Sequence, residues 1–179
     1  MKVDGGLMGN LAKAGTSAKR LESIGFHGAI TAETSHDPFF PLLLAAQETE
    51  NIELVTSIAV AFARTPMNLA NIGHDLNSFS KGRFVLGLGS QIRPHITKRF
   101  SMPWSRPAAR MREFILAMRA IWDCWHNGVP LTFQGEFYTH SLMTPMFTPV
   151  DTEYGAPKVF LAAVGPKMSE VAGEVADGI

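Results

Sequence analysis

The sequence contains a single cysteine, no excess of charge of either sign and no long apolar run. Cys124 has no second cysteine with which to form a disulfide within the chain, and we expect it to be a small packed residue of a helix. Sixteen basic residues balance sixteen acidic ones, which disfavours binding to nucleic acid or to an anionic membrane. No segment approaches the roughly 18 consecutive apolar residues of a membrane-spanning helix, and the first residues lack the pattern of a secretory signal peptide. We therefore expect a cytoplasmic protein.

Hydrophobic residues make up 46% of the chain and charged residues 18%, as in an ordinary globular domain. Short apolar runs alternate with longer amphipathic ones, which is the pattern of repeated βα units around a parallel sheet. Five units can be recognised. Strands are predicted at 2–7, 27–33, 52–61, 83–89 and 158–164. Helices are predicted at about 11–24, 39–50, 69–79, 108–127 and 166–176, and residues 177–179 resemble the turn into a sixth strand. The third helix has an apolar stripe that consists of Leu69, Ile72, Leu76 and Phe79. The fourth has a broad apolar face that we expect in the core, formed by Met111, Phe114, Ile115, Met118, Ile121, Trp122 and Trp125.

Two segments interrupt this rhythm. Residues 90–107 form an unusually long loop after the fourth strand, and loops longer than about 12 residues are often functional, so this loop is a candidate wall of an active site. Residues 128–156 are rich in proline, threonine and aromatic side chains, and we expect them to form an inserted excursion with one short strand or hairpin.

Two folds are compatible with repeated βα units. A doubly wound open sheet competes with a (β/α)8 barrel on periodicity alone. The first βα turn lacks a full G-x-G-x-x-G, which counts against the doubly wound sheet. We expect an α/β fold of the TIM (β/α)8 barrel type. Because five units cannot close a barrel of eight, we expect residues 1–179 to be the N-terminal portion of one such domain.

Active sites of such barrels form at the C-terminal ends of the strands. Polar residues and glycines follow the predicted strands at four places, namely 33–38, 57–60, 87–91 and 164–168. The histidines show no zinc-site spacing, so we expect no metal centre; they are His27, His36, His74, His95, His126 and His140.

Four segments carry a resemblance to a known family. They are ETSHDPFFPLLLAA (33–46), TSIAVAFARTP (56–66), GRFVLGLGSQIRPHITKRF (82–100) and KVFLAAVGPKMSEVAGEVADG (158–178). In this order they resemble the luciferase-like monooxygenases, and within them the branch that depends on coenzyme F420. The resemblance implies a TIM barrel that holds a deazaflavin or flavin ring at its rim, with F420 as the cofactor and FMN as the alternative.

The resemblance also implies cofactor-binding positions. A cis peptide bond is implied between Ser57 and Ile58, behind the ring, and it costs about 3 kcal/mol between non-proline residues. The other implied cofactor-binding residues are Ala59, Gly87, Gly89, Ser90, Gly165, Pro166 and Lys167. Glycine at 87 and 89 allows close approach of the backbone to a flat ring, although turn formation is an alternative. A helix N-terminus with a lysine suits a phosphate, although Lys167 is also compatible with a simple surface charge.

His36 is the candidate catalytic residue, since an imidazole can donate a hydrogen bond to the ring or transfer a proton near neutral pH. The alternative is that His36 is structural and that Asp37 caps the following helix. Asp37, Gln91 and His95 are candidates for facing the substrate, with an ordinary loop role as the alternative for the last two. Some deazaflavin-dependent dehydrogenases have a glutamate where this chain has Ser90, which weakens a sugar-phosphate dehydrogenase mechanism.

The function expected from these residues is transfer of hydride between F420, or a flavin, and a small organic substrate, with flavin-dependent monooxygenation as a related possibility. An alternative is a truncated paralogue that binds flavin or a partner chain without turnover, and a third is an open-sheet domain that binds no flavin. We expect a homo-oligomer, most simply a dimer, because an incomplete barrel leaves strand edges to be covered.

Overall fold

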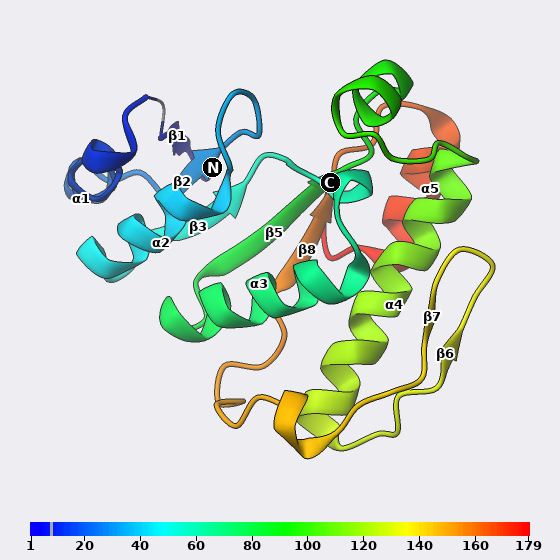
Figure 1. The fold of residues 1–179 in the computed structure, drawn as a ribbon. Helices are drawn as coiled ribbons and strands as arrows, with labels where there is room; N and C mark the ends of the chain where they lie inside the picture. Colours follow the sequence, from blue (N-terminus) through cyan, green and yellow to red (C-terminus); the bar gives the residue numbers. More distant parts are fainter. Residues whose placement is uncertain (8) are drawn as a thin grey trace.

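The computed structural model describes residues 1–7 and 9–179, so Met8, in the first βα turn, lies outside the described residues (Figure 1). Its core is a parallel sheet in which each strand lies beside the one that precedes it along the chain, where β3 and β4 together count as one strand position. The order is β1-β2-β3-β5-β8. The short β4 pairs with the same edge of β5 as β3 does, farther along that strand. The strands are β1 (Asp4–Gly6), β2 (Gly28–Thr31), β3 (Glu53–Thr56), β4 (Ala59–Val60), β5 (Phe84–Gly89) and β8 (Lys158–Leu161).

One helix follows each strand position. The helices are α1 (Ala14–Ser23), α2 (Phe39–Glu48), α3 (Pro66–Phe79), α4 (Pro107–Asn127) and α5 (Pro166–Val175). Local sequence sets their ends: the Thr65 hydroxyl accepts the Asn68 amide before α3, and Gly128 ends α4 in a left-handed conformation. Within the described residues, no helix combines the length and the apolar character that crossing a membrane requires. The element order confirms all five predicted βα units, and the ends of the helices and strands differ from the predicted ones by a few residues.

The sequential strand order distinguishes between the two folds that the sequence left open. A doubly wound sheet reverses its strand order at a switch point, whereas here the order never reverses. Gly178 forms a parallel bridge with Phe160, so the chain beyond α5 enters the next strand position, as predicted. The arrangement is that of five consecutive positions of a (β/α)8 barrel.

Two expectations about the third unit were wrong. The predicted continuous strand at 52–61 is broken, because β3 ends at Thr56 and β4 begins at Ala59. Val55 pairs with Val85 and Ala59 with Leu88, so three residues of this strand lie opposite two residues of β5, which is a β-bulge. Phe79, predicted on the apolar stripe of its helix, is 52% exposed, because at the last residue of α3 it borders an open groove between α2 and α3.

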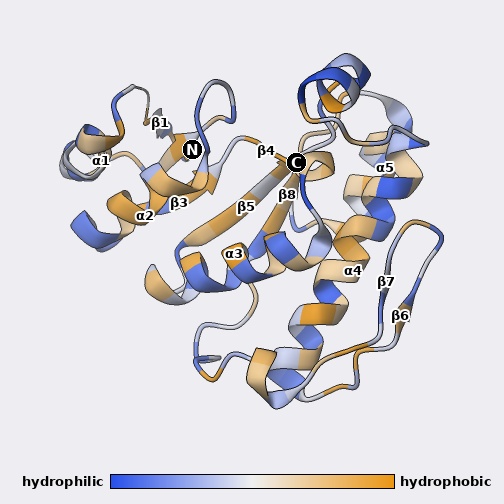
Figure 2. Ribbon diagram, viewed as in Figure 1, coloured by the Kyte–Doolittle hydropathy of each residue, from blue (hydrophilic) through white to orange (hydrophobic). Residues whose placement is uncertain are grey.

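The core lies between the sheet and the helices, and Figure 2 shows apolar colouring along β5 and β8, with apolar and polar residues alternating along α4. The face of α4 that was predicted to be buried is buried: Met111, Phe114, Ile115, Met118, Ile121, Trp122 and Trp125 are at most 5% exposed. Trp122 donates a hydrogen bond from Nε1 to the carbonyl oxygen of Ala70 at 3.0 Å, which joins α4 to α3 without leaving the indole unpaired.

The excursion at 128–156 contains the predicted hairpin, formed by antiparallel β6 (Phe133–Gln134) and β7 (Thr139–His140). Glu113 of α4 holds its turn, because the carboxylate accepts the backbone amides of Glu136, Phe137 and Tyr138. Arg110, also on α4, donates from Nε to the Tyr138 hydroxyl at 2.8 Å. The hairpin is therefore fixed to α4 by a charged side chain at each of two positions one turn apart.

A chain of polar contacts ties the end of the excursion to the helices. Asp151 accepts a hydrogen bond from the Ser78 hydroxyl at 2.6 Å, and its other oxygen lies 3.4 Å from Nε2 of the buried His74. Nδ1 of His74 lies 3.4 Å from Nε2 of His126 on α4. Burial lowers the pKa of His126, and the nearby His74 lowers it further; burial also lowers the pKa of His140 in β7.

These two histidines predict loss of stability in mild acid. A lowered pKa in the folded state means that the unfolded chain takes up protons first as the pH falls below about 6.5, so their contribution is present above that pH and is lost below it. We expect the urea midpoint of unfolding to fall between about pH 7.5 and about pH 5, and the fall to be smaller in His126→Gln/His140→Gln. Gln134→Asn, in the same hairpin, is the control and keeps the full fall. If the urea midpoint of the double variant falls between these pH values as much as that of the unsubstituted protein, this assignment is wrong.

Candidate functional site

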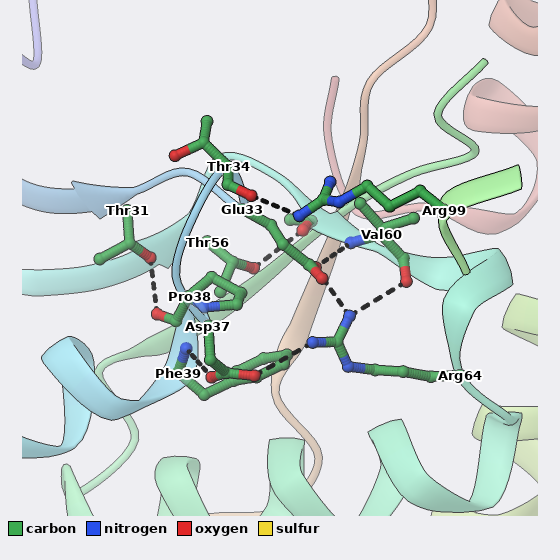
Figure 3. A network of polar contacts seen from close by, with 11 residues as sticks. Thr31, Glu33, Thr34, Asp37, Pro38, Phe39, Thr56, Val60, Arg64 and Arg99 are labelled. Carbon is green, nitrogen blue, oxygen red and sulfur yellow. Dashed lines mark hydrogen bonds and ion pairs between the residues drawn. The ribbon is translucent and has the colours of Figure 1, made fainter. Parts of the chain in front are cut away.

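Arg64, just after β4, joins the loops that follow two neighbouring strands (Figure 3). Its Nη1 donates to Glu33 at 2.7 Å, and its Nη2 donates to Asp37 at 3.1 Å. The Glu33 side chain is 6% exposed, and the same oxygen also accepts the Val60 amide at 2.7 Å. Because a buried carboxylate is costly unless it is paired, this network fixes the loop after β2 against the end of β4.

Sequence reasoning did not single out Arg64 or assign a role to Glu33. The available signal was weak: an acidic residue directly after an apolar strand needs a partner, and the arginine of the segment ARTP follows the next strand. Their 31-residue separation gives no indication of a contact. Asp37 was a candidate for facing the substrate, yet its Oδ1 accepts the Phe39 amide at 2.8 Å at the start of α2. Asp37 therefore contacts the first residue of α2, whereas Pro38 occupies the N-cap position.

The bulge between β3 and β4 contains the candidate residues Ser57 and Ile58. The peptide bond between them is cis, as the resemblance implied. The Ser57 amide donates to the Thr31 carbonyl at 2.6 Å, and the Glu33 amide donates to the Ile58 carbonyl at 3.2 Å, so the bulge remains attached to the end of β2.

Gly87 and Gly89 of β5 make room for this bulge. A Cβ at position 87 would lie 1.8 Å from the Thr56 carbonyl oxygen, and a Cβ at position 89 would lie 2.8 Å from the Ile58 side chain. The contact at 87 is with backbone, which cannot rotate away as a side chain can. The observed reason for glycine at both positions is therefore the neighbouring strand, whereas approach to a ring remains a prediction.

A hollow of about 460 Å³ opens on the inner face of the sheet. It runs the length of the strands. Charged residues line it where the strands begin, namely Lys2, Asp4, Glu53 and Lys158. Its middle is lined by the apolar residues Ile30, Val55, Val85, Phe160 and Leu161, and towards the C-terminal strand ends it is lined by Thr56, Ser57, Ile58, Gly87 and Ala162. Of the candidate residues, Ser57, Ile58 and Gly87 are thus brought together around one space. Ala59 and Gly89 are buried in the strands behind it.

The other candidates lie outside the lining of this hollow. His36 is exposed in the loop after β2, and His95 is exposed at the start of a π-helical turn, His95–Arg99, within the long loop after β5. Ser90 donates from its hydroxyl to the Gln91 carbonyl at 3.2 Å, and Gln91 accepts the Ile92 amide at 3.0 Å. Ser90 and Gln91 are therefore engaged within their own loop.

The N-terminus of α5 is open to solvent. Gly165, Pro166 and Lys167 are all exposed, and no side chain caps this helix. The amide of Lys167 lies in the first turn, where it has no acceptor within the helix. This end of α5 therefore offers a backbone donor and a side-chain cation to a ligand. Across residues 1–7 and 9–179, no cluster of three or more histidine, cysteine or acidic side chains has the geometry to hold a metal ion.

Comparison with known proteins identifies the family and the fold. The family model described as luciferase-like monooxygenase matches residues 2–179. An uncharacterized protein of Mycobacterium tuberculosis is 62% identical over 99% of this chain and 52% of its own length. The F420-dependent glucose-6-phosphate dehydrogenase of Intrasporangium calvum is 28% identical over 89% of this chain and 50% of its own length. The chain spans about half the length of these curated relatives.

Among solved structures, the oxygenating constituent of 3,6-diketocamphane monooxygenase from Pseudomonas putida, in complex with FMN, superposes with a TM-score of 0.78. The two sequences are 18% identical, and the match covers 99% of this chain and 57% of the other. This likeness shows the fold: an α/β barrel of the TIM type, of which the chain supplies about half.

Two glycine substitutions test the packing behind the hollow. Gly87→Ala places a methyl group on the Thr56 carbonyl, and we expect it to lower the free energy of unfolding by about 3 kcal/mol, the upper end for overpacking. Gly173→Ala, on the exposed side of α5, meets no atom within 4 Å and is expected to raise it by about 0.5–1 kcal/mol, since alanine favours a helix. Equal urea unfolding curves for the two variants would show that the Thr56 contact is not restrictive.

Proposed function

We propose a function from the fact that this chain belongs to the luciferase-like monooxygenase family. Residues 1–179 are the N-terminal portion of one barrel domain of an oxidoreductase. The enzyme holds coenzyme F420 at the C-terminal ends of its strands and transfers hydride between the cofactor and a small organic substrate. The observation that carries this proposal is the hollow on the inner face of the sheet, whose C-terminal end is bordered by the Ser57–Ile58 bulge.

The residues present fit such a cofactor. A flat tricyclic ring needs an apolar space with a few hydrogen-bonding groups at its border, and the hollow combines apolar walls with the exposed Ser57 beside them. The Thr56 hydroxyl is buried and donates to the Gly87 carbonyl at 2.8 Å. A phosphate needs backbone donors and a cation, and the start of α5 supplies both through Gly165 and Lys167. FMN shares the ring shape and the phosphate, so the same residues fit it as the alternative cofactor.

The cofactor supplies the hydride chemistry, and the protein supplies position and exclusion of water. Ile58 and Ala59 would provide the wall behind the ring, together with Gly87 and Gly89 of β5 and Ser90 directly after that strand. Lys167 and the first turn of α5, including Gly165 and Pro166, hold the phosphate. The exposed imidazole of His36 would donate a hydrogen bond to the ring or transfer a proton, and Asp37, Gln91 and His95 would lie towards the substrate.

Substrate class separates this chain from one of its relatives. Some deazaflavin-dependent dehydrogenases have a glutamate where Ser90 stands, and a serine hydroxyl is a much weaker proton donor than a carboxylic acid. A reaction that needs an acid at this position is therefore disfavoured, although a relative is an F420-dependent glucose-6-phosphate dehydrogenase.

A second candidate function is binding of flavin without turnover. The observation that favours it is the position of the candidate catalytic residue, because His36 is exposed and lies outside the lining of the hollow. Such a protein would bind the cofactor, but no substrate would change the absorbance of the bound ring.

Cofactor titration tests the proposed function. We expect saturable binding of F420, followed by ring absorbance and fluorescence, and weaker binding of FMN. Lys167→Gln is expected to weaken binding of the phosphate-bearing FMN about tenfold, because one charge-assisted contact is lost, and to leave riboflavin binding unchanged. Lys19→Gln, on exposed α1, is the control. If neither F420 nor FMN binds to the unsubstituted protein, the proposed function is wrong.

We also propose a homodimer that covers an apolar groove between α2 and α3. The groove has a volume of about 590 Å³, and it includes Phe40, Leu43 and Phe79, which are 60%, 42% and 52% exposed. Exposed apolar side chains gathered in one patch are typical of association surfaces.

Sedimentation velocity tests this surface. We expect a dimer for the unsubstituted protein and a monomer for Phe40→Ser/Phe79→Ser, because the double substitution removes two aromatic rings from the groove. Ile24→Ser, at an equally exposed apolar position after α1, is the control and remains dimeric. A dimer that survives the double substitution would place the interface elsewhere.

A further inference from the structure

Positive charge is concentrated in one stretch of the chain, although the whole chain is neutral. No acidic residue occurs between Asp75 and Glu113, whereas eight of the sixteen basic residues do. They are Lys81, Arg83, Arg93, Lys98, Arg99, Arg106, Arg110 and Arg112. An ordinary solvated surface mixes both signs, so this distribution calls for a partner of negative charge.

Half of these cations already have partners within the chain. Arg83 donates to carbonyl oxygens at the end of α2, and Arg110 donates to Tyr138 and to the Pro103 carbonyl. Arg106 pairs with Glu136, and Arg112 pairs with Glu174. Their charges are compensated or used in holding the loops and the hairpin.

Three cations in the loop after β5 are not compensated. Arg93, Lys98 and Arg99 are exposed, and in the part of the chain that the structure describes no carboxylate lies within ion-pair distance of them. Arg99 has a single acceptor there, the Thr34 carbonyl, and its guanidinium also lies 4.7 Å from the centre of the Phe100 ring.

These cations stand on an ordered turn. Ile96 is fully buried beneath it, the Phe100 amide donates to the His95 carbonyl at 3.0 Å, and the Met102 amide donates to the Ile96 carbonyl at 3.0 Å. The Thr97 hydroxyl donates to the Arg93 carbonyl, also at 3.0 Å. An anchored turn fixes its charges in space before a ligand arrives, which lowers the entropic cost of binding.

The turn reaches across the strand ends where the candidate site lies. It follows β5, whereas Thr34 follows β2, and the strand position between them is that of β3 and β4 with the bulge. Figure 3 shows Arg99 extending to Thr34 beside Glu33. The hydrogen bond therefore places the cationic turn at the same end of the sheet as Ser57 and Ile58.

We propose that Arg93 and Lys98, with Arg99 beside them, bind an anionic group of the substrate, so that the substrate class is a small organic acid or phosphate ester with an apolar portion. This inference rests on the proposed function. The cofactor's phosphate is assigned to the start of α5, so the turn provides a second anion site. The apolar portion of the substrate faces the apolar hollow while its charged end lies against the turn.

A matched pair of probes tests the charge requirement. Phenylacetate and phenylacetamide have nearly the same shape, but only the first is charged. Binding to the purified protein, with and without cofactor, is measured by ligand-observed NMR at low ionic strength. We expect phenylacetate to bind about tenfold more tightly, and the preference to shrink with added salt. Arg93→Gln/Lys98→Gln is expected to abolish the preference, while Lys13→Gln/Lys19→Gln, near α1, keeps it.

Three outcomes would overturn the proposal: equal affinity for the two probes, a preference that survives in the Arg93→Gln/Lys98→Gln variant, or a variant that weakens FMN binding but not riboflavin binding. The last outcome would assign the anion to the cofactor instead. Failure of the proposed function is distinguishable, because it appears as absent cofactor binding in the unsubstituted protein, whereas the preference between probes is also measured without cofactor.

Discussion

The contact between the Thr56 carbonyl and Gly87 is the constraint on which the candidate site depends. β3 and β4 contribute three residues where β5 contributes two, and the additional residue is accommodated only because no side chain occupies position 87. Glycine at position 89 likewise leaves room for the Ile58 side chain. Two glycines on one strand thus leave the space that the bulge of the neighbouring strand occupies, and the bulge borders the C-terminal end of the hollow.

A buried ion pair holds the loops around that bulge. Glu33 accepts both the Arg64 guanidinium and the Val60 amide, so the end of β2 and the end of β4 share one carboxylate. Removing either partner would leave a charge in a place with little water, which is much costlier than losing an exposed pair. The loop that carries His36 is therefore anchored at Glu33 and again at Asp37, and His36 lies exposed between these two fixed points.

The sequence predicted most of the fold because parallel strands buried on both faces give continuous apolar runs, and amphipathic helices give a different period. The same rule explains the main error. The segment IELVTSIAVA has apolar and β-branched residues on both sides of its break, so its composition does not reveal that pairing stops at Thr56 and resumes at Ala59. The Arg64 network was missed because it joins residues 31 apart, a distance in sequence that no local pattern encodes. The glycines of β5 were found, but their observed role concerns the adjacent strand, which only the register reveals.

Strand order connects the bulge to the cationic turn. In a sheet whose strands follow one another in sequence, the loop after β5 can contact the loop after β2 only by passing over the intervening position, and Arg99 makes that contact through the Thr34 carbonyl. The intervening position is the bulged one. The C-terminal end of the hollow and the uncompensated cations of the crossing loop thus lie at the same end of the sheet, and they differ in what they attract. An apolar part of a ligand would bind in the hollow, because removing water from its apolar walls is favourable. An anionic group would bind to the turn, because the cations there have no carboxylate partner within the described chain. A neutral apolar molecule would leave the turn uncompensated, and a small inorganic anion would leave the hollow unfilled.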